Sequence, residues 1–247
     1  MLYKTKGIVL KSFPFSEADT IVTIFTKENG KIEMLAKGAK KLKSRLSSSV
    51  QPFTLGEYTY YQKNNNLPLL RQADVLDHYK NLMKSLSLTF STYYICELLD
   101  FFLPSAQEQS KVFDLTAKTL DYLNRYPDNH SVILSAFKIK AMALLGYSPQ
   151  LASCVHCGRG HSDNKFIFSI KDGGIICRNC IPQKTAFLAK KEIYLLLLLL
   201  KSTFEDILKI DISINDLTVV DSILVRYIKY HCDGRTFKSE DFLKNYT

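Results

Sequence analysis

The sequence predicts an α+β protein built from several modules: a small barrel of five β-strands, then an all-helical domain that carries a metal-binding insertion. Three observations support this fold class. Short runs of β-branched residues alternate with turn residues up to about residue 76, apolar residues then recur at helical spacing, and two Cys-x-x-Cys pairs interrupt the helical part. Such patterns are typical of strands, helices and metal knuckles, respectively. We therefore expect a barrel domain at residues 1–79 and a helical domain at 80–247, with the insertion at about 150–183.

Five runs in the first domain have the alternation expected of strands. These runs are residues 7–10, 20–26, 31–36, 54–62 and 69–76. Asn29 and Gly30 predict a hairpin turn between the second and third runs, because both residues tolerate positive φ. Five short strands in a module of this size favour the OB-fold. Tyr58 and Tyr60 share one face of the fourth strand, while Tyr61 points to the other face. The tyrosine side chains of one face could stack on unpaired bases, and the alternative is that they belong to the core or rim of the barrel.

The second domain begins with an apolar stripe that predicts a long helix from His78 to a point before Pro104. The stripe consists of Leu82, Leu86, Phe90, Tyr94 and Leu98. Further helices are expected at residues 112–126, 131–145, 190–208, 215–232 and 239–245. The apolar run at 193–200 is far shorter than the roughly 20 residues that span a membrane, so we expect a buried core helix there. Cys96 and Cys232 lie on apolar helix faces and should act as small buried hydrophobes.

The two Cys-x-x-Cys pairs form the strongest chemical signal. Cys154, Cys157, Cys177 and Cys180 place two pairs at a separation within the roughly 15–20 residues typical of zinc sites. Four thiolates in a tetrahedron suit one structural Zn²⁺ and leave no open position for a substrate. Two disulfides, four unrelated core thiols or an iron–sulfur cluster are the alternatives. His156 and His161 could each replace a sulfur, although four thiolates make them unnecessary.

The formal net charge of +9 points to a polyanionic partner, either nucleic acid or an acidic membrane. The segment at residues 31–50, at and after the third strand, holds six basic residues and one acidic residue, a net charge of +5. Residues 1–79 hold twelve basic and seven acidic residues, also +5, so this segment supplies the whole excess charge of the barrel. The candidate DNA-contacting residues are Lys37, Lys40, Lys41, Lys43 and Arg45. A clustered cationic loop, with or without a short helix, suits contacts with phosphates. The alternative is a solvated face that only increases solubility.

No catalytic motif stands out. The sequence has no P-loop, no dinucleotide-binding glycine pattern, no H-E-x-x-H and no G-x-S-x-G, so we expect no enzyme. Glu17 and Asp19 form the one candidate carboxylate pair, and their place between two strands favours a turn-forming role over divalent-metal hydrolysis. The first seven residues lack the apolar core of a signal peptide. Together with reduced, metal-bound cysteines, this start predicts a cytoplasmic protein. A partner that is DNA would further place it on the nucleoid.

Several segments, taken in order, resemble the RecO family of bacterial recombination mediators. They are residues 7–10, 15–26, 30–31, 36–40, 43–45 and 51–53, then Gly146 to Leu151 before the first knuckle and Phe168 to Gly174 before the second. The resemblance covers most of the first 180 residues, and the last 65 or so resemble the family only as an apolar helical region.

The resemblance implies an N-terminal OB-fold, a helical domain and a zinc-binding insertion. It implies binding of single- and double-stranded DNA, annealing of complementary strands, and action with RecR to help RecA replace single-strand-binding protein. The zinc ligands carry over onto Cys154, Cys157, Cys177 and Cys180, and the DNA contacts onto Lys37, Lys40, Lys43 and Arg45. Lys41 is added from its charge alone. The contact with the acidic tail of single-strand-binding protein would belong to the helical domain.

A zinc-ribbon adaptor in transcription, whose basic loop touches RNA or promoter DNA, is the alternative from another functional class. Strand annealing distinguishes the two functions, since a RecO-like protein must accelerate it and an adaptor need not.

Overall fold

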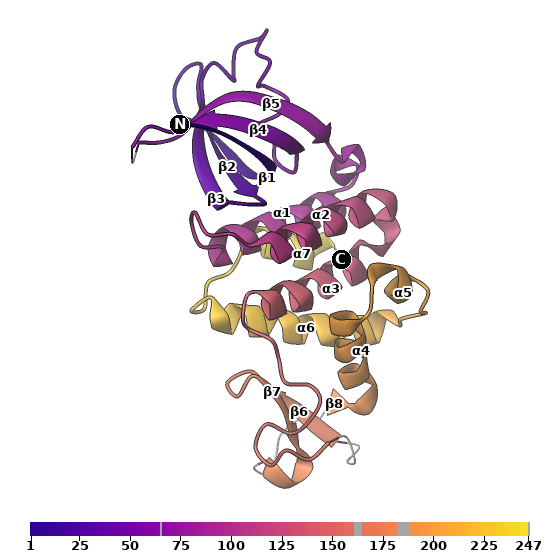
Figure 1. Ribbon diagram of the computed structural model, residues 1–247. Helices are drawn as coiled ribbons and strands as arrows, with labels where there is room; N and C mark the ends of the chain where they lie inside the picture. Colours follow the sequence, from indigo (N-terminus) through magenta and orange to yellow (C-terminus); the bar gives the residue numbers. More distant parts are fainter. Residues whose placement is uncertain (65, 161–164, 182–187, 247) are drawn as a thin grey trace. The chain divides into compact units, whose positions relative to one another are not determined.

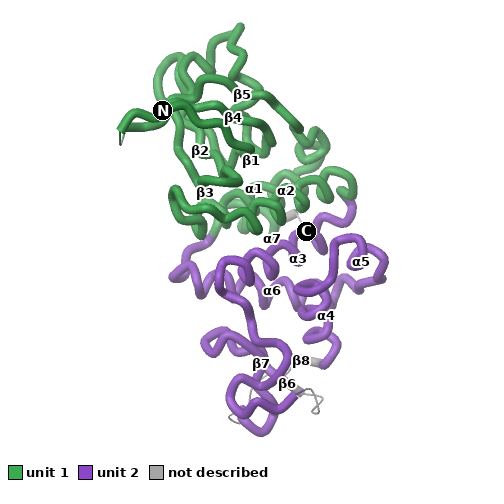
Figure 2. Tube along the Cα trace, in the orientation of Figure 1, with its two compact units in different colours: residues 1–127, 237–247 green, residues 128–236 purple. Residues whose placement is uncertain are grey.

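The computed structural model describes residues 1–64, 66–160, 165–181 and 188–246. Strands come first in the chain and helices follow, with a small second sheet between α3 and α4 (Figure 1). The chain forms two compact units (Figure 2). Unit 1 consists of Met1–Pro127 and Phe237–Thr247, and unit 2 of Asp128–Thr236.

Unit 1 contains a closed five-stranded barrel. Its strands are β1 (Leu2–Pro14), β2 (Thr20–Thr26), β3 (Gly30–Ala36), β4 (Leu55–Tyr61) and β5 (Leu69–Asp77). They pair in the order β1-β2-β3-β5-β4, and only the β3–β5 pair is parallel. This is the OB-fold that the strand pattern predicts, with helices following it in the chain.

β1 is three times as long as predicted, because it belongs to both sides of the barrel. Its first half pairs with β4, from Leu2 opposite Tyr61, and its second half pairs with β2, as far as Pro14 opposite Thr20. A β-bulge between Val9 and Lys11 bends the strand between its partners. Polar residues toward both ends of β1 interrupt the apolar pattern, so the sequence predicts only the central part of the strand.

The barrel is filled by apolar side chains from all five strands. Val9, Met34 and Tyr58 are fully buried there, and the Tyr58 hydroxyl donates a 3.0 Å hydrogen bond to the Ser49 carbonyl. Tyr60 is also buried. The suggestion that Tyr58 and Tyr60 stack on bases is therefore wrong, because their rings form the core of the barrel. Core packing was the alternative, and the structure confirms it.

The β2–β3 hairpin is present where Asn29 and Gly30 predict it, but only Gly30 adopts a positive φ, of 62°. The Thr26 side chain closes the turn by donating to the Gly30 carbonyl at 2.8 Å. Gly30 also lies against the segment before α2, and a Cβ added to Gly30 would meet the Gln107 carbonyl oxygen at 2.1 Å. Two separate constraints, one conformational and one steric, thus require glycine here.

We expect Gly30→Ala to destabilise the protein more than Gly38→Ala does. Both glycines have similar positive φ, 62° and 68°, so each substitution costs about 1–2 kcal/mol for the left-handed conformation. A Cβ at Gly38 meets only the flexible Lys41 side chain, at 3.6 Å, whereas one at Gly30 must displace backbone. Urea unfolding followed by circular dichroism measures the difference. Equal losses of unfolding free energy would show that the Gln107 contact is unimportant.

The helices of unit 1 pack against the barrel and each other. They are α1 (Leu86–Phe102), α2 (Ser110–Arg125) and α7 (Lys238–Tyr246), preceded by a 3₁₀ turn at Lys80–Met83. Phe25 of β2 meets Phe113 of α2 edge to face at 5.4 Å, and Asp100 of α1 forms an ion pair with Lys11 of β1. The division into domains at residue 79 remains a proposal, since these helices form one compact unit with the barrel.

The long helix expected from His78 begins later, at Leu86. The Ser85 hydroxyl caps the helix by accepting from the Leu88 amide, and Tyr79 adopts a left-handed conformation that a continuous helix does not allow. Leu86 is accordingly exposed, although the every-fourth-residue stripe predicts that it is buried.

Unit 2 contains α3 (His130–Leu144), α4 (Lys190–Lys201), α5 (Phe204–Leu208) and α6 (Ile214–His231). The single helix expected at residues 190–208 is two helices, because the Thr203 hydroxyl accepts from the Asp206 amide and starts α5. Cys96 of unit 1 and Cys232 of unit 2 are buried, as predicted. Among the residues that the structure describes, no helix is both long enough and apolar enough to cross a membrane.

Candidate metal centre and nucleic-acid interface

The four cysteines of the two knuckles meet at one point in unit 2. They lie around a small sheet of β6 (Lys165–Ser169), β7 (Gly174–Cys177) and β8 (Leu188–Ala189), in the order β7-β6-β8, although only Cys177 is part of a strand. The first knuckle is held against β7 by the Val155 amide, which donates to the Ile175 carbonyl at 2.9 Å. The second knuckle begins at the end of β7, with Cys177.

The distances between the sulfurs suit a shared metal ion. All four Sγ atoms lie within 4.8 Å of one another, and those of Cys157 and Cys177 are 3.7 Å apart. Zn–S bonds of about 2.3 Å in a tetrahedron place sulfurs about 3.8 Å apart. A disulfide would need about 2.05 Å, and all six cysteines of the chain are free thiols. The cluster can therefore hold a metal ion.

Backbone amides around the cluster favour thiolates. Burial alone would raise the pKa of Cys154, but N–H groups, including that of Cys177 at 3.4 Å, lower this pKa to about 6. A backbone hydrogen bond from Arg159 likewise lowers the pKa of Cys157. The hydrogen bond with Cys157 raises the pKa of Cys180 to about 12. Without a cation, the negative charge of one thiolate thus keeps a neighbouring thiol protonated. A metal ion bound by all four sulfurs would allow all four to be thiolates, because a coordinating thiol is deprotonated.

Of the two histidines considered as ligands, the structure describes only His156, and its side chain is not part of the cluster. The His156 side chain is exposed and its Nε2 lies 3.5 Å from a carboxylate oxygen of Asp172, away from the sulfurs. His161 lies outside the described residues.

The sequence pattern does not reveal β6 and β7, because strands of five and four residues give no clear alternation. The signal that could have found them is the Gly173-Gly174 pair between two apolar runs. Gly174 forms an isolated β-bridge with Gln150, and a Cβ added to Gly174 would be 2.4 Å from the Gln150 carbonyl oxygen. The fold of this ribbon therefore depends on glycine as well as on cysteine.

The second candidate site is the loop between β3 and β4. Its five candidate residues, Lys37, Lys40, Lys41, Lys43 and Arg45, are all exposed. Residues 37–54 form successive turns and no helix, so the short helix considered above is absent from this described loop. The structure thus gathers the five cations on one loop.

The cationic loop is anchored in the barrel. The side chains of Ala39 and Val50 are buried in its core, and Leu46 packs against that core. The loop also binds the β1–β2 turn: the Gly38 amide donates to Asp19 Oδ1 at 2.8 Å, and the Lys40 amide to the Ala18 carbonyl at 3.0 Å. Anchored apolar residues hold the backbone, while the five cationic residues stay exposed to solvent.

Asp19 has the structural role that its position predicts. Its carboxylate accepts from the Gly38 amide, and its own amide donates to the Ser16 hydroxyl at 3.1 Å. Asp19 therefore forms and braces the β1–β2 turn, as predicted, and its contacts are with protein groups.

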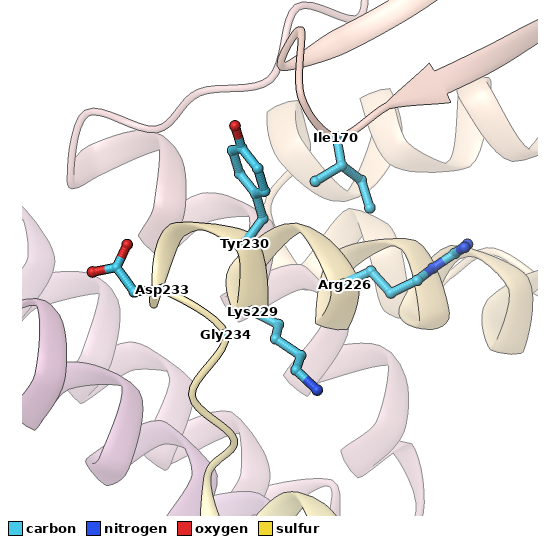
Figure 3. A pocket seen from close by; sticks show the side chains of 6 residues that line it. All are labelled: Ile170, Arg226, Lys229, Tyr230, Asp233 and Gly234. Atoms are coloured by element: carbon cyan, nitrogen blue, oxygen red, sulfur yellow. The ribbon is translucent and has the colours of Figure 1, made fainter.

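Unit 2 has a surface pocket of about 520 Å³ at the end of α6. Ile170 reaches toward the helix from the β6–β7 turn, while Arg226, Lys229 and Tyr230 spread around its last turns, and Asp233 and Gly234 complete the lining (Figure 3). Two cations and the Asp233 carboxylate give the lining a net charge of +1, and together with Ile170 and Tyr230 this suits an acidic segment that also carries an apolar side chain.

Comparison with known proteins defines the class: the chain belongs to the Recombination protein O family of DNA repair proteins. A family profile described as Recombination protein O N terminal matches residues 1–79, and one described as Recombination protein O C terminal matches residues 83–241.

Individual relatives agree with this family. DNA repair protein RecO of Caldanaerobacter subterraneus subsp. tengcongensis is 33% identical over 97% of this chain and 96% of its own length. DNA repair protein RecO of Alkaliphilus metalliredigens is 32% identical over 99% of each chain. DNA repair protein RecO of Bacillus subtilis is 36% identical over 74% of this chain and 70% of its own. The resemblance drawn from the sequence segments is thus confirmed.

Proposed function

We propose that this protein is a DNA-binding recombination mediator that anneals complementary strands. The observation that carries the proposal is the gathering of five exposed cations on one anchored loop of an OB-fold barrel. Such a loop neutralises phosphates without reading base identity, because phosphates carry no sequence information. Membership in a family of DNA repair proteins supports DNA as the polyanion.

The mechanism is electrostatic and stoichiometric, with no catalytic step. When Lys37, Lys40, Lys41, Lys43 and Arg45 neutralise phosphates on a bound strand, repulsion between that strand and its complement decreases. Base pairing then drives annealing. Double-stranded DNA binds to the same loop through the same charges. The protein would act in the cytoplasm, on the nucleoid, where its DNA partner lies.

Cys154, Cys157, Cys177 and Cys180 would hold one zinc ion per chain. The zinc would supply a structural cross-link, because four protein ligands leave no position for a substrate. The soft, all-sulfur donor set and the even spacing of the two pairs favour zinc over harder cations. The cross-link would join the knuckle at 154–157 to the end of β7.

The proposed protein partners come from the family resemblance. With RecR, the protein would help RecA to replace single-strand-binding protein on DNA. The acidic tail of single-strand-binding protein would dock on unit 2, and the pocket at the end of α6 supports this because its lining includes both cations, Arg226 and Lys229, and the apolar Ile170.

Annealing of complementary oligonucleotides, bare or coated with single-strand-binding protein, tests the function. We expect the protein to accelerate annealing of both. Arg226→Glu combined with Lys229→Glu should leave bare strands unaffected and weaken action on coated strands by about tenfold, since each reversal replaces attraction by repulsion of about 0.5–1 kcal/mol.

Failure to accelerate bare strands would overturn the proposed function and favour the transcription adaptor. Full action of the charge-reversed variant on coated strands would place the tail site elsewhere. Lys209→Glu combined with Lys201→Glu is a suitable control, because both residues are exposed cations of unit 2 outside the pocket.

A further inference from the structure

Two phenylalanines at the β1–β2 turn are exposed to solvent. The Phe13 residue is 54% exposed and Phe15 is 61% exposed, although burying such a ring stabilises a protein by about 1.5–3 kcal/mol. Single exposed apolar residues are ordinary, but two aromatic rings within three positions are not. The Lys11 ammonium lies 5.6 Å from the centre of the Phe13 ring, and this contact still leaves Phe13 more than half exposed. Tyr58 and Tyr60 of β4 cannot replace them as a stacking surface, since both are buried, and the exposed Tyr61 points to the other face of that strand.

The turn that carries these rings is bonded to the cationic loop. The Lys40 side chain donates to the Ser16 carbonyl at 3.2 Å, next in sequence to Phe15. The Lys40 and Gly38 amides bond to Ala18 and Asp19. Three hydrogen bonds therefore hold the turn that carries the exposed rings against the loop that carries the cations.

A third apolar side chain is exposed on the cationic loop itself. Leu42 is fully exposed, and it lies between Lys41 and Lys43 in the middle of the cationic loop. An apolar protein partner would prefer a less charged surface, because charged residues are depleted in the cores of protein interfaces. A polyanion with flat apolar faces fits better, and an unpaired nucleic-acid strand has that chemistry.

We propose that Phe15, with Phe13 beside it, is a platform on which unpaired bases stack while the cationic loop holds the phosphates of the same strand. This inference rests on the proposed DNA binding and deepens it, because it gives the site a preference for single strands. Bases in a duplex are already stacked on each other, so duplex DNA would use the charges alone.

The sequence provides a sharp probe, since the protein contains no tryptophan. Phe15→Trp places a single tryptophan on the platform, and Leu76→Trp places one on β5 at a comparably exposed position, 52% in Leu76, as the matched control. With an unpaired oligonucleotide we expect strong quenching of Phe15→Trp fluorescence and little change in Leu76→Trp. A duplex of the same length should quench neither.

Alanine substitutions give the second measurement. Phe13→Ala combined with Phe15→Ala should weaken binding of the unpaired oligonucleotide about 5- to 150-fold per stacked base, from about 1–3 kcal/mol each. Duplex affinity and the salt slope should not change, because no charge is removed. Phe15→Tyr should retain the affinity. Circular dichroism melting of each variant checks that the barrel is intact.

The two proposals can fail separately. Oligonucleotide binding without quenching of Phe15→Trp, or equal quenching by the duplex, would overturn the platform while DNA binding stands. A blue shift of Phe15→Trp with anionic phospholipid vesicles, and not with oligonucleotide, would assign the rings to a membrane surface. Absence of any DNA binding by the unaltered protein would overturn the proposed function itself.

Discussion

Cys154→Ser is expected to abolish metal binding and to unfold the ribbon of unit 2. The native protein should contain one zinc per chain and the variant none, because three thiolates and a hydroxyl no longer form a closed site. At a free zinc concentration about 1,000-fold above Kd, the stabilisation lost is about 4 kcal/mol. Elemental analysis of protein purified without chelator measures the metal, and thermal unfolding measures the stability.

The ribbon has little else to hold it together. Its strands β6 and β7 have five and four residues, and its buried apolar side chains include Phe166, Ile175 and Ile176. A core of this size does not offset the conformational entropy of ordering the knuckles. Cys177→Ser should therefore behave like Cys154→Ser.

His156→Ala is the matched control for the metal prediction. It changes an exposed residue of the same knuckle whose side chain points toward Asp172, so one zinc per chain should remain. Iron in place of zinc in the native protein, or full metal content in Cys154→Ser, would contradict the assignment.

Replacing the five cations of the loop by alanine is expected to weaken DNA binding strongly and for all sequences alike. The substitutions are Lys37→Ala, Lys40→Ala, Lys41→Ala, Lys43→Ala and Arg45→Ala. If about three to five of these side chains neutralise phosphates, the slope of log affinity against log salt flattens by roughly 3 to 4.5 for duplex DNA. Titration of a labelled duplex at several salt concentrations measures this slope.

A control variant with the same change in net charge distinguishes direct contact between the loop and phosphates from the general attraction of a positively charged protein to DNA. It replaces five exposed lysines of unit 1 that lie outside the loop: Lys63, Lys80, Lys84, Lys111 and Lys118. We expect the control to lower affinity only slightly and to keep the salt slope. An unchanged slope in the loop variant would show that the loop is a solvated face.

Much of the architecture follows from local sequence. The strands at 20–26 and 69–76 agree with β2 and β5 to within one residue, and the turn before Gly30 is where Asn29 and Gly30 place it. Two Cys-x-x-Cys pairs suffice to predict a shared cluster, because each knuckle positions its own two sulfurs and only one further contact brings them together. Such features depend on interactions among residues near each other in the chain, and a sequence pattern records them directly.

The tertiary structure alone decided which aromatic side chains are available to a ligand. Tyr58 is buried because Val9 and Met34, distant in sequence, close the barrel around it. Phe15 is exposed because the turn that carries it is held against the cationic loop rather than against the core. Alternation along a strand shows which side chains share a face, but it does not show which face the barrel encloses. That choice is made by contacts between strands far apart in the sequence, so it is settled only when the barrel closes.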